Sequence, residues 1–174
     1  MKSETEPTPT IHASAVAIGG EGVLIRGLPR AGKTTLGQAL IAQAGSDRAG
    51  REAPTEKLAM WVSDDRTIVE HDGVNLIASP PAAIAGRIAD RKRGIVSVPH
   101  AASAILALVV DLDLLNDHPQ SLGSAKLLGE VLPMLRLPPV SPINADDAAR
   151  HVLSVLQAPT DRPDPQMLTN QDVD

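Results

Sequence analysis

The fold of this chain is decided by residues 22–35, GVLIRGLPRAGKTT. The apolar run Val23 to Arg26 breaks into a loop bounded by Gly27 and Gly32, and the loop ends in Gly-Lys-Thr, which completes a Walker A pattern. The apolar run predicts a buried strand, and the Ala- and Leu-rich stretch Thr34 to Ala44 predicts a helix. The context therefore indicates a phosphate-binding loop between a strand and a helix.

The residue types in this loop suit a polyphosphate. Gly27 lets the chain turn out of the strand, and Gly32 lets backbone N–H groups approach an anion without a Cβ in the way. Lys33 supplies a positive charge for the β- and γ-phosphates, and Thr34 supplies a hydroxyl for Mg²⁺. We predict binding of ATP with Mg²⁺. The loop residues expected to contact the nucleotide are Gly27, Leu28, Pro29, Arg30, Ala31, Gly32, Lys33, Thr34 and Thr35.

Composition narrows the class of protein. A length of 174 residues with 43% hydrophobic residues suits one folded domain. One Trp, no Phe or Tyr and a formal charge of −5 argue against a nucleic-acid partner, because bases stack on aromatic side chains and phosphates attract basic surfaces. The chain has no Cys, so it has neither disulfides nor thiolate metal sites.

The ends of the chain differ from its middle. Residues 1–9 and 158–174 are polar and contain prolines, so we expect disorder there and a single kinase-like domain over 10–157. No apolar run approaches the ~20 residues that cross a bilayer. The N-terminal residues do not have the basic then apolar order of a signal peptide. We therefore expect a cytoplasmic protein without a membrane partner.

The pattern along the rest of the chain predicts a mixed α/β domain with the phosphate loop at its centre. The strands expected are Ile11–Ile18, Leu58–Val62, Arg66–Glu70, Val74–Ala78, Ile95–Val98 and Ala104–Leu112. The helices expected, besides the one after the loop, are Ala82–Ile88 and Asn144–Leu156. The remaining segments are a mobile connection at Gly45–Lys57, a loop at Asn116–Lys126 and an apolar stretch at Leu127–Leu137 that Pro133 interrupts.

Phosphoryl transfer also needs carboxylates at a strand end beside the loop, one to hold the metal ion and often one to receive a proton. Two places qualify. Asp64 and Asp65 end a short strand, whereas Asp111 and Asp113 follow an apolar strand in the manner of a Walker B segment. Periodicity does not choose between the two pairs.

The run from residue 12 to residue 113 resembles the C-terminal catalytic domain of HPr kinase/phosphorylase, in the short form that lacks the N-terminal domain. The matching segments keep their order and intervals over roughly 100 residues. They are His12, GVLIRG (22–27), GKT (32–34), SDDR (63–66), DG (72–73), ASPPAAIAG (78–86) and RGIVSVP (93–99).

This resemblance implies a fold related to phosphoenolpyruvate carboxykinase and an ATP-dependent phosphorylation of a serine in a small, HPr-like phosphocarrier protein, reversible by phosphorolysis. It implies that Lys33 binds phosphates, that Thr34 and one of Asp64 and Asp65 hold Mg²⁺, and that the other aspartate is the general base. It also implies that His12 assists at the reacting phosphate and that the protein is a homo-oligomer.

The chain departs from the family pattern in two places. The loop has Pro29-Arg30-Ala31 where the family has small residues. The family signature Glu-x-Arg-Gly aligns with Ala89, Asp90, Arg91 and Lys92, so that only Arg91 is kept, for phosphate binding. The metal-side glutamate is missing unless a one-residue shift puts Asp90 in its place. Two alternatives stay open: a nucleotide-binding regulatory module or pseudokinase without turnover, and a conventional P-loop small-molecule kinase that uses Asp111.

Overall fold

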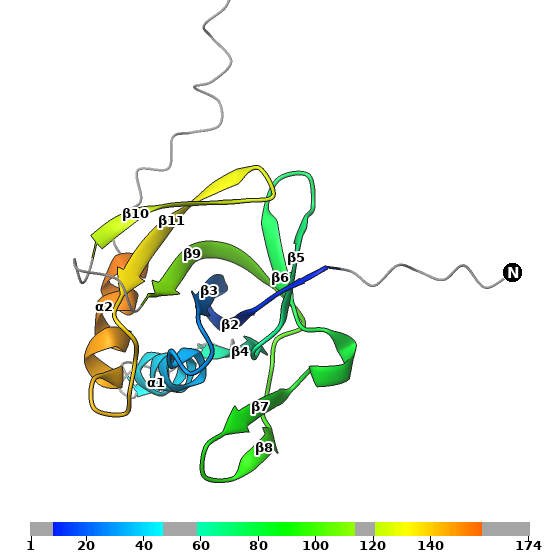
Figure 1. Ribbon diagram of the computed structural model, residues 1–174. Helices are drawn as coiled ribbons and strands as arrows, with labels where there is room; N and C mark the ends of the chain where they lie inside the picture. Colours follow the sequence, from blue (N-terminus) through cyan, green and yellow to red (C-terminus); the bar gives the residue numbers. More distant parts are fainter. Residues whose placement is uncertain (1–8, 47–58, 114–120, 158–174) are drawn as a thin grey trace, which may run out of the picture.

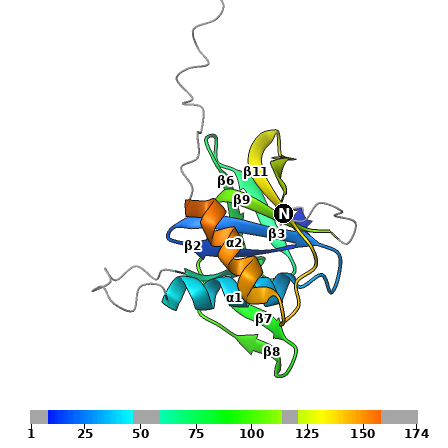
Figure 2. The ribbon, with the colours of Figure 1, turned by 90° about the vertical axis from the view of Figure 1, so that its left-hand side faces the viewer.

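The computed structural model describes residues 9–46, 59–113 and 121–157. A nine-stranded mixed sheet forms the body, and a separate two-stranded sheet lies beside it (Figure 1). The two helices pack against each other, and α2 crosses in front of strands β2 and β3 in Figure 2. None of the described helices is long and apolar enough to cross a membrane.

The elements have the following bounds. The strands of the main sheet are β1 Thr10–Ile11, β2 Ala13–Ile18, β3 Glu21–Gly27, β4 Ala59–Ser63, β5 Thr67–His71, β6 Leu76–Ser79, β9 Ala104–Leu112, β10 Ser121–Leu127 and β11 Glu130–Leu137. The small sheet consists of β7 Arg87–Asp90 and β8 Gly94–Ser97. The helices are α1 Lys33–Ser46 and α2 Ala145–Gln157, and Ala82–Ile84 forms one 3-10 turn, η1.

The sheet places the phosphate loop at the carboxyl end of a central strand pair. The order is β1-β5-β6-β9-β3-β2-β4, and β9 runs parallel to β3 on one side and to β11 on the other. Because β3 and β9 are parallel, with Arg26 opposite Asp111, both strands end at the same edge of the sheet. Within β9, the five apolar residues from Leu106 to Val110 are all buried, and this run ends at Asp111, as expected for a strand covered on both faces.

Apolar side chains pack on both faces of the sheet. The cluster between the sheet and the helices contains Val16, Ile25 and Trp61 from the sheet and Leu36 from α1, and the opposite face carries a second cluster with many alanines. The chain has one Trp and no Phe or Tyr, so branched aliphatic residues and Ala fill the core and let the layers approach closely. Helix α1 therefore lies directly on the ring of Trp61 in β4.

Most of the predicted elements are confirmed. The strand Ala104–Leu112 has the predicted bounds, and α1, α2 and the β2–β3 and β5–β6 hairpins lie within a few residues of their predicted places. The predicted strand Ile11–Ile18 is divided at His12, because β1 pairs with β5 whereas β2 pairs with β3 and β4.

The predicted helix Ala82–Ile88 is wrong. Only one 3-10 turn forms there, and Arg87 begins β7. Gly86 has a φ of +71°, which ends the turn, and Ile88 is buried between exposed neighbours in the alternation of a strand. The basic residues Arg87, Arg91, Lys92 and Arg93 therefore lie on a β-hairpin.

The predicted loop Asn116–Lys126 is also wrong over its described part, because Ser121–Leu127 is strand β10 and pairs with β11. The expected interruption at Pro133 is also absent, since β11 continues through this residue. Pairing of β11 with β9 begins only at Met134, so the missing N–H of Pro133 breaks no bond of that ladder. The predictions for residues 1–8, most of Gly45–Lys57, residues 116–120 and 158–174 lie outside the described residues.

Candidate active site

The phosphate loop is fixed to the segment before α2. The N–H of Ala31 donates to the carbonyl of Leu28 over 3.1 Å, and the N–H of Val140 donates to the carbonyl of Ala31 over 2.8 Å. Arg30 and Gly32 have φ angles of +66° and +96°. A Cβ at Gly32 would collide with the carbonyl oxygen of Val140, so this position requires glycine for contact as well as for conformation.

Lys33 begins α1 and folds back under the loop. Its Nζ donates to the carbonyl oxygens of Gly27 and Leu28, each over 3.1 Å. Burial lowers the pKa of the Lys33 ammonium, and the negative charges of Asp65 and Asp64 oppose that shift. The Lys33 ammonium is thus bound by carbonyl oxygens of the same loop that would bind a phosphate.

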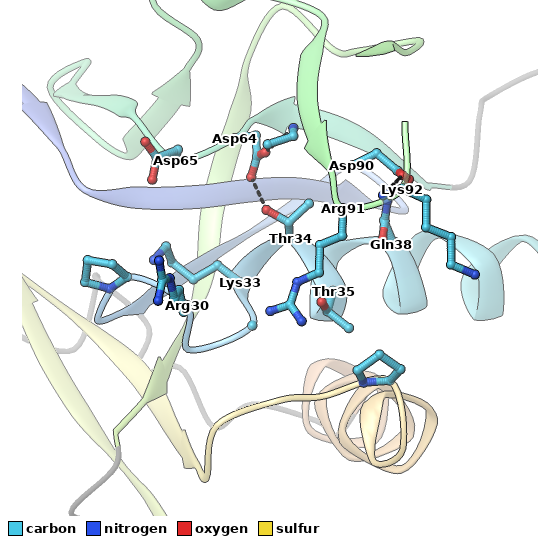
Figure 3. A pocket seen from close by; sticks show the side chains of 14 residues that line it. Arg30, Lys33, Thr34, Thr35, Gln38, Asp64, Asp65, Asp90, Arg91 and Lys92 are labelled. Carbon is cyan, nitrogen blue, oxygen red and sulfur yellow. Dashed lines mark hydrogen bonds between the residues drawn. The ribbon is translucent and has the colours of Figure 1, made fainter. Parts of the chain in front are cut away.

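Asp64 lies directly after β4 and faces the beginning of α1 (Figure 3). Its Oδ1 accepts hydrogen bonds from the hydroxyls of Thr34 at 2.9 Å and Ser14 at 2.8 Å, and its Oδ2 accepts from the N–H of Ala89 at 3.0 Å. The residue is 5% exposed. Three donors from three segments therefore fix the orientation of a buried carboxylate beside the Walker A threonine.

Asp65 has a different environment from its neighbour. Its side chain is 64% exposed, and its Oδ1 lies 2.7 Å from Nε2 of His12, whose side chain is 43% exposed. Its backbone has a φ of +65°, and its N–H donates to Ser14 Oγ over 3.1 Å. The two aspartates thus diverge: Asp64 turns inward to Thr34 and Asp65 outward to His12.

A cavity of about 590 Å³ collects most of the predicted site residues. Its lining consists of Pro29, Arg30, Gly32, Lys33, Thr34, Thr35, Gln38, Asp64, Asp65, Ala89, Asp90, Arg91, Lys92 and Pro142. The loop lines one side, and the turn between β7 and β8, which carries Arg91 and Lys92, lines another (Figure 3). Gly27, Leu28 and Ala31 belong to the loop but are not part of this lining.

Asp90, the one-residue-shifted candidate for the signature glutamate, is occupied within its own hairpin. Its Oδ1 accepts from the N–H groups of Lys92 and Arg93, both over 2.9 Å, and its Oδ2 lies 3.3 Å from Nε2 of Gln38 in α1. The N–H of Arg93 and then that of Lys92 hold the pKa of this carboxyl below its usual range. Asp90 therefore closes the turn and anchors the hairpin to α1.

The donor set suits Mg²⁺. Thr34 and Asp64 present hard oxygen atoms within hydrogen-bond distance of each other, and Asp65 lines the same cavity. Among residues 9–46, 59–113 and 121–157, no group of three or more His, Cys, Asp or Glu could hold a metal ion by itself. Mg²⁺ is typically bound by one or two carboxylates together with substrate phosphates and water, so this sparse set fits that ion.

Asp111 lies outside this constellation. It stands at the end of β9, and its Oδ2 accepts from Arg26 Nη2 over 3.1 Å. It does not line the cavity. The arginine that precedes Gly27 therefore neutralises the carboxylate that a conventional Walker B assignment would use.

Sequence reasoning missed several residues of the site. Ser14 in β2, Gln38 in α1 and Pro142 before α2 contact or line it from segments that carry no motif. The only signal for Ser14 is a hydroxyl within an otherwise apolar strand.

No protein-family model and no curated protein sequence matches the chain. Among solved structures, the Hpr(Ser) kinase/phosphatase from Coxiella burnetii is similar to it, with a TM-score of 0.64 and 23% sequence identity. The similarity covers 85% of this chain and 93% of that one. The chain therefore has the fold of this kinase/phosphatase, as the sequence resemblance predicted.

Proposed function

We propose that this protein is an ATP- and Mg²⁺-dependent phosphotransferase of the HPr kinase/phosphorylase type. It would act in the cytoplasm, as a homo-oligomer, on a serine of a small, HPr-like phosphocarrier protein, reversibly by phosphorolysis. One observation carries the proposal: Lys33, Thr34 and both aspartates line one cavity. Thr34 donates to Asp64 there over 2.9 Å, and His12, outside the lining, lies 2.7 Å from Asp65.

The binding residues have separate tasks. The loop and Lys33 hold the phosphates of ATP, and Arg91, on the facing hairpin, adds a planar cation suited to phosphate oxygens. Thr34 and Asp64 would hold Mg²⁺, which when bound neutralises charge on the transferred group. The buried, triply bonded carboxylate of Asp64 suits this metal role because its orientation is fixed.

Asp65 is the proton acceptor. Its exposed carboxylate can reach an incoming serine hydroxyl, which loses its proton to Asp65 as its oxygen forms a bond to the γ-phosphorus. The bond from that phosphorus to the bridging oxygen breaks, and ADP leaves. His12, at 2.7 Å, orients Asp65 and assists at the reacting phosphate.

Transfer from radiolabelled ATP to a small phosphocarrier protein tests this assignment. Asp64→Asn and Asp65→Asn should each lower the rate of transfer by at least about 100-fold. Circular dichroism should show that the fold of both variants is intact. Asp111→Asn is the matched control, since it changes an aspartate at a neighbouring strand end, and it should be mild. Full transfer by Asp65→Asn would refute its role as the base.

A second candidate is a regulatory module that binds ATP without turnover. It is favoured by the signature, since Ala89 stands where the family has a glutamate and Asp90 is bonded within its hairpin. In that case calorimetry would detect ATP binding while the wild-type protein transfers no label. The conventional kinase, in contrast, predicts that Asp111→Asn is the most damaging variant, and the pairing of Asp111 with Arg26 speaks against it.

A further inference from the structure

One buried hydroxyl touches both aspartates. Ser14 in β2 has no exposed surface, and its Oγ donates to Asp64 Oδ1 over 2.8 Å. The same oxygen accepts the backbone N–H of Asp65 over 3.1 Å. A serine hydroxyl has one proton to donate and lone pairs to accept with, so both bonds form together.

The sheet places this hydroxyl beside the turn that carries the aspartates. Strand β2 pairs with β4 antiparallel, and the register shifts between Ala15, which faces Ser63, and Val16, which faces Trp61. Such irregularities re-aim side chains and occur often near active sites. Ser14 directly precedes Ala15 in β2, and the aspartates follow Ser63, the last residue of β4.

The turn itself needs support. Asp65 has a φ of +65°, a conformation that costs a residue with a Cβ roughly 1 kcal/mol or more. Its carboxylate is more than half exposed, so packing contributes little to holding it. The bond from its N–H to Ser14 Oγ, together with the bond from the N–H of Arg66 to the carbonyl of Asp64 over 2.8 Å, stabilises this conformation.

We propose that Ser14 is a positioning residue for phosphoryl transfer. The Ser14 hydroxyl bonds to both aspartates, and it thereby fixes the proton-accepting Asp65 relative to the metal-side Asp64. The inference rests on the proposed function for its consequence in catalysis, but the geometric claim can be tested without turnover.

The kinetic test compares Ser14→Ala with Ser14→Thr. Ser14→Ala should lower kcat about 10- to 100-fold, because a base displaced by about 1 Å loses that much, while the affinity for ATP changes by less than about threefold. Ser14→Thr keeps the oxygen and should restore most of the rate. An equal loss in kcat from both variants, with melting temperatures at the wild-type value, would overturn the proposal.

Thr67→Val provides the matched control. Thr67 is also a fully buried hydroxyl, and its Oγ1 donates to the carbonyl of Ala13 over 2.8 Å rather than to a carboxylate. Loss of this bond should lower stability and leave kcat within about twofold. A loss of kcat in Thr67→Val as large as that in Ser14→Ala would contradict a specific role for Ser14.

Hydrogen exchange of the Asp65 amide, followed by NMR, tests the geometry directly. Exchange in Ser14→Ala should be about tenfold faster than in the wild type and unchanged in Thr67→Val. If the wild type transfers no phosphate, the proposed function fails, yet this measurement still decides whether Ser14 holds Asp65. An unchanged exchange rate in Ser14→Ala would refute the inference.

Discussion

At the scale of single residues, two adjacent aspartates have different surroundings. Asp64 is 5% exposed and receives three hydrogen bonds, whereas the side chain of Asp65 is 64% exposed and faces His12. A fixed carboxylate suits a metal ion, and an accessible one suits a proton. The sequence Asp-Asp places both residues at one strand end but does not distinguish them.

Gly32 provides a residue-scale prediction about the loop. Gly32→Ala should lower the free energy of unfolding by on the order of 3 kcal/mol, since it adds a collision with Val140 to the cost of a positive φ. Gly73→Ala is the control, because Gly73 has a similar φ of +103° and open space around it, and should cost about 1 kcal/mol. Chemical denaturation measures both. Equal losses would show that the contact with Val140 is unimportant.

At the scale of elements, α1 is positioned by a glycine that faces an aromatic ring. A Cβ at Gly37 would collide with the indole of Trp61 in β4, so the helix can approach the sheet only without a side chain there. This contact sets the distance between α1 and the sheet. It therefore also positions Thr34, at the beginning of α1, relative to Asp64, which follows the end of β4. Helix propensity alone would favour alanine at this position.

Two glycine-to-alanine substitutions in α1 should therefore change the free energy of unfolding in opposite directions. Gly37→Ala should destabilise the protein by about 1–3 kcal/mol through overpacking against Trp61. Gly45→Ala, where a Cβ meets nothing within 4 Å, should stabilise it by up to about 1 kcal/mol, since alanine is the better helix former. Thermal and urea unfolding measure both changes. A stabilising Gly37→Ala would mean that α1 does not rest on this ring.

At the scale of the whole molecule, the site is assembled from segments far apart in the chain. The phosphate loop, the end of β4 and the β7–β8 turn line one cavity, and the loop is hydrogen-bonded to residue 140 before α2. A ligand in this cavity would contact several of these segments together. Binding should therefore stabilise the folded state as a whole.

This coupling predicts a thermal shift. ATP with Mg²⁺ at about 100 times its Kd should add about 2.7 kcal/mol, which corresponds to a rise in Tm of roughly 5–10 °C for a chain of this size. Removing Mg²⁺ with EDTA should reduce the rise, and Lys33→Ala should remove most of it. Differential scanning calorimetry gives the result. A full shift in Lys33→Ala would refute the role of this lysine in binding.

The sequence by itself determined the strand, loop and helix around residues 22–35 and the central strand Ala104–Leu112, because their signals are local: a glycine-bounded loop, helical periodicity and an unbroken apolar run. Together with the motif order, these signals also predicted the fold that the Coxiella burnetii protein shares. Errors occurred at Arg87–Ile88 and Ser121–Lys126, where pairing with a partner strand overrides weak local preference.

Only the tertiary structure decided which carboxylates face the loop. Asp111 lies in β9, which is parallel to β3, and is neutralised by Arg26. Asp64 reaches Thr34 from the end of β4, which pairs with the other side of β2. Ser14 also lies at the site because β2 pairs with β4. Its contacts join residues about fifty positions apart in the sequence. Alternation along a strand predicts which face of the sheet a side chain takes, but it does not predict which strand lies beside it.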